Sequence, residues 1–175
     1  MVNKSFKDMN SAIDYINNYI KNPCLGLPEQ LFTLVSRLTP LVNVDLLIKD
    51  ENKRILLSWR DDKYSGVGWH IPGGIVRFME KLETRIKEVS KIEIKTEVKY
   101  NLIPLKVQES IFYRDNFIRS HFIAFLYRCS LSNKVKLNNK GLKEGDVGYL
   151  KWHDSCPKNL IKCQKIYSKY FSKEF

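Results

Sequence analysis

The chain has 175 residues, of which 43% are hydrophobic and 28% charged, and 30 lysines and arginines against 19 acidic residues give a formal charge of +11. This length supports one domain with a substantial core and a terminal appendage. No apolar run reaches about eighteen residues, which excludes a membrane span. The N-terminus lacks the continuous apolar segment of a signal peptide. We therefore expect a cytoplasmic protein.

The positive charge alone would suggest a nucleic-acid partner. The lysines are scattered, however, with no block of five or more and no arginine-rich tract interleaved with aromatic residues. We expect no nucleic-acid partner and only a weak, salt-screened attraction for an anionic nucleotide. The four cysteines form no C-x-x-C pair and no zinc-like cluster with histidine, which predicts free thiols and no structural zinc.

The first part of the chain is predicted to be helical. A capping-box pattern, S-x-x-D from Ser5, opens a run of apolar residues at helical spacing that ends before Pro23. A second helix follows Pro28 and stops before Pro40. We assign residues 1–36 to a helical appendage without catalytic residues, whose apolar face packs on the domain or on a partner subunit.

From Leu41 onward the hydrophobic period becomes that of strands. Strands are predicted over residues 42–48, 55–59, 69–71, 95–107, 109–113, 118–128 and 149–152. Pro157 opens a last helix. Interleaved strands with helices packed outside them predict an α+β fold with a mixed sheet, which we assign to residues 37–175.

The stretch from Gly73 reads G-G-I-V-R-F-M-E-K-L-E-T-R-I-K-E-V-S-K-I-E-I-K and resembles the Nudix box, G-x5-E-x7-R-E-U-x-E-E-x-G-U with U aliphatic. Gly74 takes the first Gly position, and Glu80 and Glu93 take the first and last Glu positions without a gap. The positions of the Arg, the next two Glu and the final Gly hold Glu88, Val89, Ile92 and Lys95 instead. The resemblance implies a Nudix fold, a mixed β-sheet sandwiched between helices, with an extra N-terminal helical segment here.

One Nudix branch, the GDP-mannose mannosyl hydrolases, also keeps only the last Glu of the trio and releases GDP and free sugar from GDP-sugars. The similarity to this branch covers residues 37–170. It includes T-P-L-V-N-V-D from Thr39, L-L-S-W-R ending at Arg60, W-H-I-P-G-G from Trp69 and F-Y-R-D-N-F from Phe112.

Helix geometry bears on the role of Glu93. Leu82, Ile86 and Val89 define one apolar face, and Glu93 falls near that face three turns after Leu82. A carboxylate there is costly unless it is paired or bound to a metal. Alternatively, the helix ends near Lys91 and Glu93 opens the next strand in solvent.

The resemblance implies a Mg²⁺ (or Mn²⁺) site formed by the carbonyl of Gly73, by Glu93 and by Asp146, which stands where the branch has a Gln ligand. Such a hard cation needs few protein oxygens, because substrate phosphates and water complete its shell. Glu144 is close enough to replace Asp146. The alternative is that Asp146 only belongs to the turn around Gly145.

The resemblance also implies substrate-binding residues. Asp45 matches an acid that faces the active site, although a solvated strand edge would also explain it. Arg60 matches a diphosphate-binding Arg, a role that suits its forked cation, although a strand often ends in a surface Arg. Arg77 lies near the position of a second branch Arg. Trp69 and His121 keep matching places, although a lone strand histidine is more often structural.

The general base is left open, because the branch's loop His is Val147 here. Asp146, Glu144, His70 or His121 could serve, and we count Asp146, Glu144 and Arg60 as the catalytic candidates.

The leading hypothesis is a Mg²⁺-dependent hydrolase of nucleotide-diphosphate sugars, GDP-sugar-like, that acts at the anomeric carbon. A box with so few carboxylates is poorly equipped to activate water for attack on phosphorus. The alternatives are a pyrophosphohydrolase that cleaves at phosphorus and a catalytically impaired nucleotide-sugar-binding protein. The branch implies a homodimer. The sugar and the base depend on loops such as residues 61–68 and 130–146.

Overall fold

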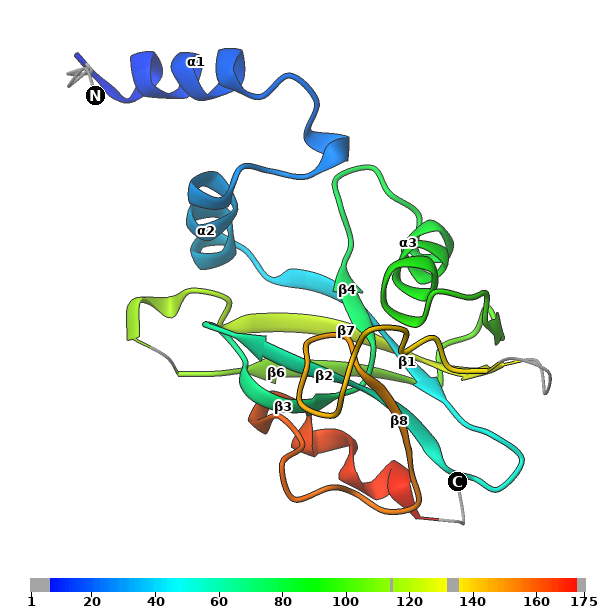
Figure 1. The fold of residues 1–175 in the computed structure, drawn as a ribbon. Coiled ribbons are helices and arrows are strands. Elements are labelled where there is room, and N and C mark those ends of the chain that lie inside the picture. The colour runs from blue at the N-terminus through cyan, green and yellow to red at the C-terminus, as the bar shows by residue number, and fades with distance from the viewer. Residues whose placement is uncertain (1–6, 114, 132–135, 173–175) are drawn as a thin grey trace.

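Figure 1 shows the computed structural model, which describes residues 7–113, 115–131 and 136–172. Helix α1 (Met9–Tyr19), the turn η1 (Pro23–Leu25) and helix α2 (Glu29–Leu38) precede the strands. The strands are β1 (Leu41–Ile48), β2 (Ile55–Asp62), β3 (Gly66–His70), β4 (Gly73–Ile75), β5 (Lys99–Tyr100), β6 (Lys106–Ile111), β7 (His121–Ser130) and β8 (Leu150–His153). The remaining helical elements are α3 (Leu82–Val89), η2 (Ser90–Ile94), η3 (Asp115–Phe117) and η4 (Lys162–Phe171).

The strands form two sheets, in agreement with the predicted α+β architecture. In the larger sheet the order is β4-β1-β7-β5, with β6 also paired to β7. Its centre is the parallel pair β1 and β7, and its other pairs are antiparallel. The smaller sheet, β3-β2-β8, is antiparallel. Figure 1 shows α3 and η4 on opposite sides of these sheets.

Strand β1 supplies both hydrophobic cores, as its alternating side chains require. Val44, Leu46 and Ile48 pack in the cluster that contains Ile86 of α3. Leu47 packs in the second cluster, which contains the aromatic residues of η4. By the same alternation Asp45 lies on the Leu47 face, so the strand directs its acid toward η4.

The helix of the box does not end at Lys91. Helix α3 continues as the π-helical turn η2, so Glu93 lies within the helical segment and does not open a strand. Lys95 ends it with a left-handed backbone, φ 61°. A glycine would adopt this conformation without strain, and Gly is the residue that the Nudix pattern has there.

Several predicted boundaries were wrong. The predicted strand 95–107 is a short β5 followed by a loop, and β6 begins only at Lys106. The last helix begins at Lys162 and not at Pro157, and it is a 3-10 helix with Gln164, Tyr167 and Tyr170 buried at every third residue. The capping box of α1 is formed by Asp8 and Ser11, and Ser5 lies outside the described residues.

Helix α1 extends away from the body of the protein (Figure 1), and none of its residues is buried. The predicted boundary at residue 36 falls within α2, and the division into appendage and domain stays a prediction. Among the described residues, no helix is long and apolar enough to cross a membrane.

Candidate active site

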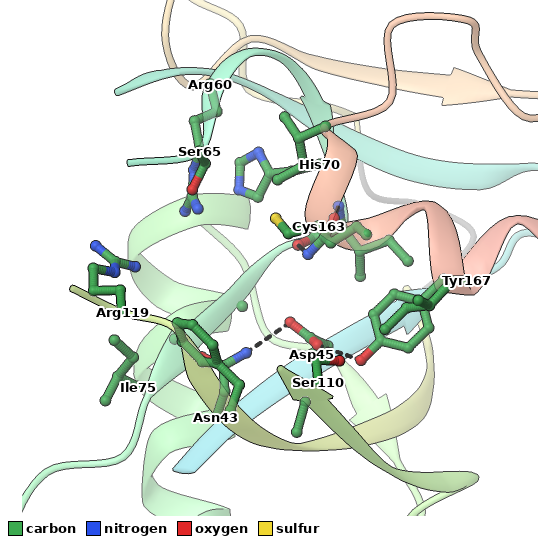
Figure 2. A pocket seen from close by; sticks show the side chains of 18 of the residues that line it. Asn43, Asp45, Arg60, Ser65, His70, Ile75, Ser110, Arg119, Cys163 and Tyr167 are labelled. Atoms are coloured by element: carbon green, nitrogen blue, oxygen red, sulfur yellow. Dashed lines mark hydrogen bonds between the residues drawn. The ribbon is translucent and has the colours of Figure 1, made fainter. Parts of the chain in front are cut away.

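A pocket opens beside β1 and β4, where η4 and the loop between β2 and β3 meet the larger sheet (Figure 2). Its residues come from segments that are far apart in the sequence. They are Asn43, Asp45, Arg60, Ser65, His70, Ile71, Gly73, Gly74, Ile75, Ser110, Phe112, Arg119, Phe122, Ala124, Ile161, Cys163, Gln164, Ile166 and Tyr167.

Asp45 is the buried acid of this pocket, with 4% of its surface exposed. Its Oδ1 accepts a hydrogen bond from Asn43 Nδ2 at 2.8 Å, and its Oδ2 accepts one from the Tyr167 hydroxyl at 2.7 Å (Figure 2). Burial raises the pKa of Asp45 to about 6; the bonds from Tyr167 and Asn43 lower it in part, and the charge of Glu93 adds to the rise. The carboxyl can therefore exchange a proton near neutral pH.

Tyr167 comes from η4 and keeps its proton. Burial, followed by the charge of Asp45 and the bond to it, raises the pKa of Tyr167 far above its ordinary value. The phenol is therefore a fixed donor to the carboxylate. Gln164, one 3-10 turn earlier, accepts from the Ile71 N–H at 2.6 Å and donates to the Ile71 carbonyl at 3.1 Å. These bonds hold η4 against the site.

Gly73 and Gly74 are needed because neighbouring atoms leave no room for a Cβ at either position, and neither has a left-handed backbone. Gly73 pairs with Asp45 across β1 and β4, and a Cβ on Gly73 would lie 2.4 Å from Asp45 Oδ1. A Cβ on Gly74 would lie 2.8 Å from a methyl of Val89 on α3. The pair therefore lets the acid and the box helix approach β4 together.

Within the β1–β4 ladder, Gly73 lies at a position without hydrogen bonds to β1. The Leu46 N–H donates to the Pro72 carbonyl, and the Val76 N–H donates to the Val42 carbonyl. In an antiparallel ladder bonded and non-bonded pairs alternate, so the pair of Asp45 and Gly73 is a non-bonded one. The Gly73 carbonyl is thus not used by this ladder, which suits the ligand role that the sequence predicts for it.

Glu93 reaches the pocket through His70. Glu93 Oε2 lies 2.9 Å from His70 Nε2, and His70 Nδ1 lies 2.8 Å from the Ser58 carbonyl oxygen. A carbonyl only accepts, so Nδ1 carries a proton, and the bond to Glu93 needs a second one. The buried imidazole therefore connects the Ser58 carbonyl with the carboxyl of Glu93, whose side chain is 20% exposed.

Arg60 and Arg119 approach the same side of the pocket, next to Ser65 (Figure 2). Arg60 Nε lies 3.4 Å from Asp62 Oδ2. Burial raises the pKa of Asp62, but bonds from the Ser65 and Tyr64 N–H groups and the charges of both arginines outweigh this and lower it. Asp62 therefore stays ionised beside two cations, and this side of the pocket keeps an excess of positive charge.

The other box positions serve the fold. Arg85 donates two hydrogen bonds to Glu80, each 2.8 Å, and both side chains are nearly buried. Arg85 lies three residues before the position where the box has its Arg. Val89 is 3% exposed under Gly74, and Ile92 is 61% exposed. Neither position contributes a carboxylate.

The predicted loop acids are engaged elsewhere. Asp146 Oδ2 accepts from the Lys143 N–H at 2.8 Å, and both oxygens of Glu144 lie 2.9 Å from Lys151 Nζ. In the part of the chain that the structure describes, neither acid lines the pocket, and no three His, Cys, Asp or Glu residues gather as a metal cluster. Gly73 and Glu93 thus fit only a sparse metal site.

Three further predicted residues lie outside the pocket as described. Trp69 is a core residue, 3% exposed, with its ring against Trp59 and His153. His121 Nε2 lies 3.1 Å from Glu109 Oε1 at the surface, and Arg77 is exposed. Their roles in substrate binding stay predictions.

Sequence reasoning missed Arg119, Tyr167, Gln164 and Cys163, all of which line the pocket. The signal for Tyr167 was weak but present, because aromatic and polar residues recur at every third position in η4. Arg119 stands just before a strand, in the same setting as many surface arginines, and nothing in the sequence connects it with Arg60.

Comparison with known proteins matches residues 39–155 to the NUDIX domain. A MutT NUDIX hydrolase from Burkholderia pseudomallei is 21% identical, with a TM-score of 0.59 over 77% of this chain and 99% of that one. A MutT protein from Methanosarcina mazei Go1 is 18% identical, with a TM-score of 0.56 over 78% and 96%. A UDP-X diphosphatase is 17% identical, with a TM-score of 0.54 over 95% and 81%. The chain belongs to the Nudix family and is a Nudix hydrolase.

Proposed function

We propose that this enzyme hydrolyses nucleotide-diphosphate sugars at the anomeric carbon, releasing free sugar and nucleoside diphosphate. The observation that carries the proposal is that charged side chains line the pocket, whereas the box helix beside it has few carboxylates. The pocket holds the buried acid Asp45 and the cations Arg60 and Arg119. The helix beside it has lost the carboxylates at Val89 and Ile92 that phosphorus chemistry would use.

In this proposal Asp45 is the general base. Water attacks the anomeric carbon, the bond from that carbon to the diphosphate oxygen breaks, and the diphosphate leaves with the bonding electrons. The proton of the water passes to Asp45, whose pKa of about 6 is close to the operating pH of a cytoplasmic enzyme. Tyr167 and Asn43 fix the orientation of the carboxylate. Attack from the face opposite the leaving group inverts the anomeric centre.

Arg60 would hold the diphosphate, as its forked donors suit two phosphate oxygens. A Mg²⁺ or Mn²⁺ ion held by Gly73 and Glu93 would neutralise charge on the same leaving group. Asp146 and Glu144 are left out of the proposal, because Asp146 accepts from the Lys143 N–H and Glu144 pairs with Lys151 of β8. GDP-sugars, a homodimer and a cytoplasmic location stay predictions.

Hydrolysis at phosphorus is the second candidate. It is favoured by the proximity of Glu93 to Asp45, since the charge of Glu93 contributes to the raised pKa of Asp45. In this candidate Asp45 would activate the water, and Glu93 with the Gly73 carbonyl would hold the metal.

A screen of nucleotide sugars with Mg²⁺ or Mn²⁺, with products resolved by phosphorus NMR, tests the proposal. We expect nucleoside diphosphate and free sugar. Nucleoside monophosphate and sugar phosphate would establish the second candidate. Tight binding without turnover under every metal would overturn both and indicate a catalytically impaired binding protein.

Replacing Glu93 with Gln tests the metal assignment. We expect it to abolish turnover and metal-dependent binding with little change in unfolding. Glu97→Gln, at an exposed position shortly after the helix, is the matched control. Full activity in Glu93→Gln would show that Glu93 is not a ligand.

A further inference from the structure

We infer that Arg119 binds the diphosphate of the substrate together with Arg60, and that helix α2 positions Arg119 for this role. The inference rests on the proposed function for the chemistry of its ligand, a diphosphate. Arg119 and Arg60 reach the pocket from different segments, one before β7 and the other within β2, and converge beside Ser65 (Figure 2). Two guanidinium groups at one side of a pocket match the paired charges of a diphosphate.

Helix α2 contacts Arg119 at its backbone and at its guanidinium. The Arg119 N–H donates to Ser36 Oγ at 3.3 Å, and Ser36, which is 3% exposed, donates in turn to the Thr33 carbonyl at 2.8 Å. The guanidinium carbon lies 5.9 Å from the ring centre of Phe32, also on α2, and 4.8 Å from that of Tyr64. Aromatic faces attract the cation and restrict its orientation.

The same helix also contacts the loop that follows Arg60. Glu29 at the start of α2 forms an ion pair with Lys63 and accepts from the Tyr64 hydroxyl at 3.4 Å. Glu29 and Lys63 are exposed, so the pair adds little stability. The pair instead helps to position the two arginines, because α2 contacts both the loop after Arg60 and the segment that carries Arg119.

The backbone at Arg119 indicates that its surroundings impose its position. Arg119 has a left-handed backbone with φ 49°, which is unfavourable for a residue with a Cβ. Asn116 and Phe117, just before it, are left-handed as well. Such strain persists where neighbouring contacts fix a residue, as Ser36 and the two rings do here.

Binding of inorganic pyrophosphate, measured by calorimetry without metal at low ionic strength, tests the first half of the inference. We expect Arg119→Gln to weaken binding by about tenfold or more, because charge-assisted bonds are lost. Arg119→Lys should also bind more weakly, since an ammonium lacks the fork. Arg37→Gln, which removes an exposed cation from the same helix, should stay within about twofold of wild type. Unchanged binding in Arg119→Gln, equal loss in Arg37→Gln, or no binding by the wild type would overturn the inference.

The positioning role of α2 is tested by a double-mutant cycle. Ser36→Ala should weaken pyrophosphate binding about threefold in the wild type and have no further effect in Arg119→Gln, because both changes act through one side chain. Phe32→Leu should give the same pattern. It replaces Ser36→Ala in the cycle if circular dichroism shows that Ser36→Ala does not fold. Additive effects would contradict the positioning role.

These measurements need no turnover, so they separate this inference from the proposed function. If Arg119→Gln binds pyrophosphate normally while nucleotide sugars are hydrolysed, only the inference fails. If pyrophosphate binding depends on Arg119 but no nucleotide sugar is hydrolysed, only the proposed function fails.

Discussion

The box helix and the pocket beside it differ in what their charged residues do. Glu80, just before α3, bonds to Arg85 of the helix, and Val89 of the helix fills the space under Gly74. In the pocket, Asp45 is buried with a raised pKa, and Arg60 and Arg119 line one side. Glu93 connects the two regions through His70.

This difference shows that the residues of a motif that are needed for packing can be present without the carboxylates that bind metal. The glycine pair is retained because a Cβ on Gly73 would strike Asp45 and a Cβ on Gly74 would strike Val89. That steric requirement persists whatever the helix carboxylates do. We therefore place most of the chemistry on the pocket side, and the predictions below test that division.

The largest effect is expected at Asp45. Asp45→Asn should lower kcat by about a hundredfold to ten-thousandfold, as expected for loss of a general base. It should also stabilise the fold at pH 8 by roughly 1 to 3 kcal/mol, because folding raises the pKa of Asp45 and therefore disfavours its charged form.

The stability gain should shrink as the pH falls toward 4, where Asp45 is protonated in the folded protein. Chemical denaturation at several pH values and steady-state kinetics measure the two effects. Asp61→Asn, at an exposed position of β2, is the control. A loss of both activity and stability would mean that Asp45 is a structural acid.

Restoring box carboxylates on α3 and η2 should test the helix side of the comparison. Val89→Glu should cost about 3 kcal/mol or more, because it buries a charge without a partner. Ile92→Glu, at an exposed position, should change stability by less than about 0.5 kcal/mol. Urea denaturation measures both, and a well-tolerated Val89→Glu would show that the helix face is still open to a metal cluster.

Tyr167→Phe should shift the pH profile and thereby sharpen the assignment of the base. The wild-type rate should fall as the pH drops below about 6, where Asp45 is protonated. The Tyr167 hydrogen bond lowers the pKa of Asp45, so its removal should move this acid limb to higher pH. An unshifted limb in the kcat profile would assign it to another group.

A small effect on stability alone is expected at Lys95. Lys95→Gly should stabilise the fold by about 1 kcal/mol, because glycine adopts the left-handed conformation without a Cβ penalty. Activity should not change. Thermal unfolding checks this, and a destabilised variant would mean that the Lys95 side chain contributes more than its backbone strain costs.

Much of the fold and part of the site follow from local sequence patterns. Strand alternation placed Asp45 on one face of β1, and the ungapped frame placed Glu93 on the box helix. The assignment of Asp146 as a ligand rests on its position in the sequence, whereas the orientation of its side chain is set by its own turn with Lys143. Tyr167 meets Asp45 across 122 positions, a separation that no local pattern reports.

The place where water enters the products tests the central claim most directly. With the wild-type enzyme in heavy-oxygen water, attack at the anomeric carbon places the label on the released sugar and leaves the nucleoside diphosphate unlabelled. This is the result that a pocket with Asp45 and few helix carboxylates predicts. Label on a phosphate would contradict the account and would show that the altered box still supports hydrolysis at phosphorus.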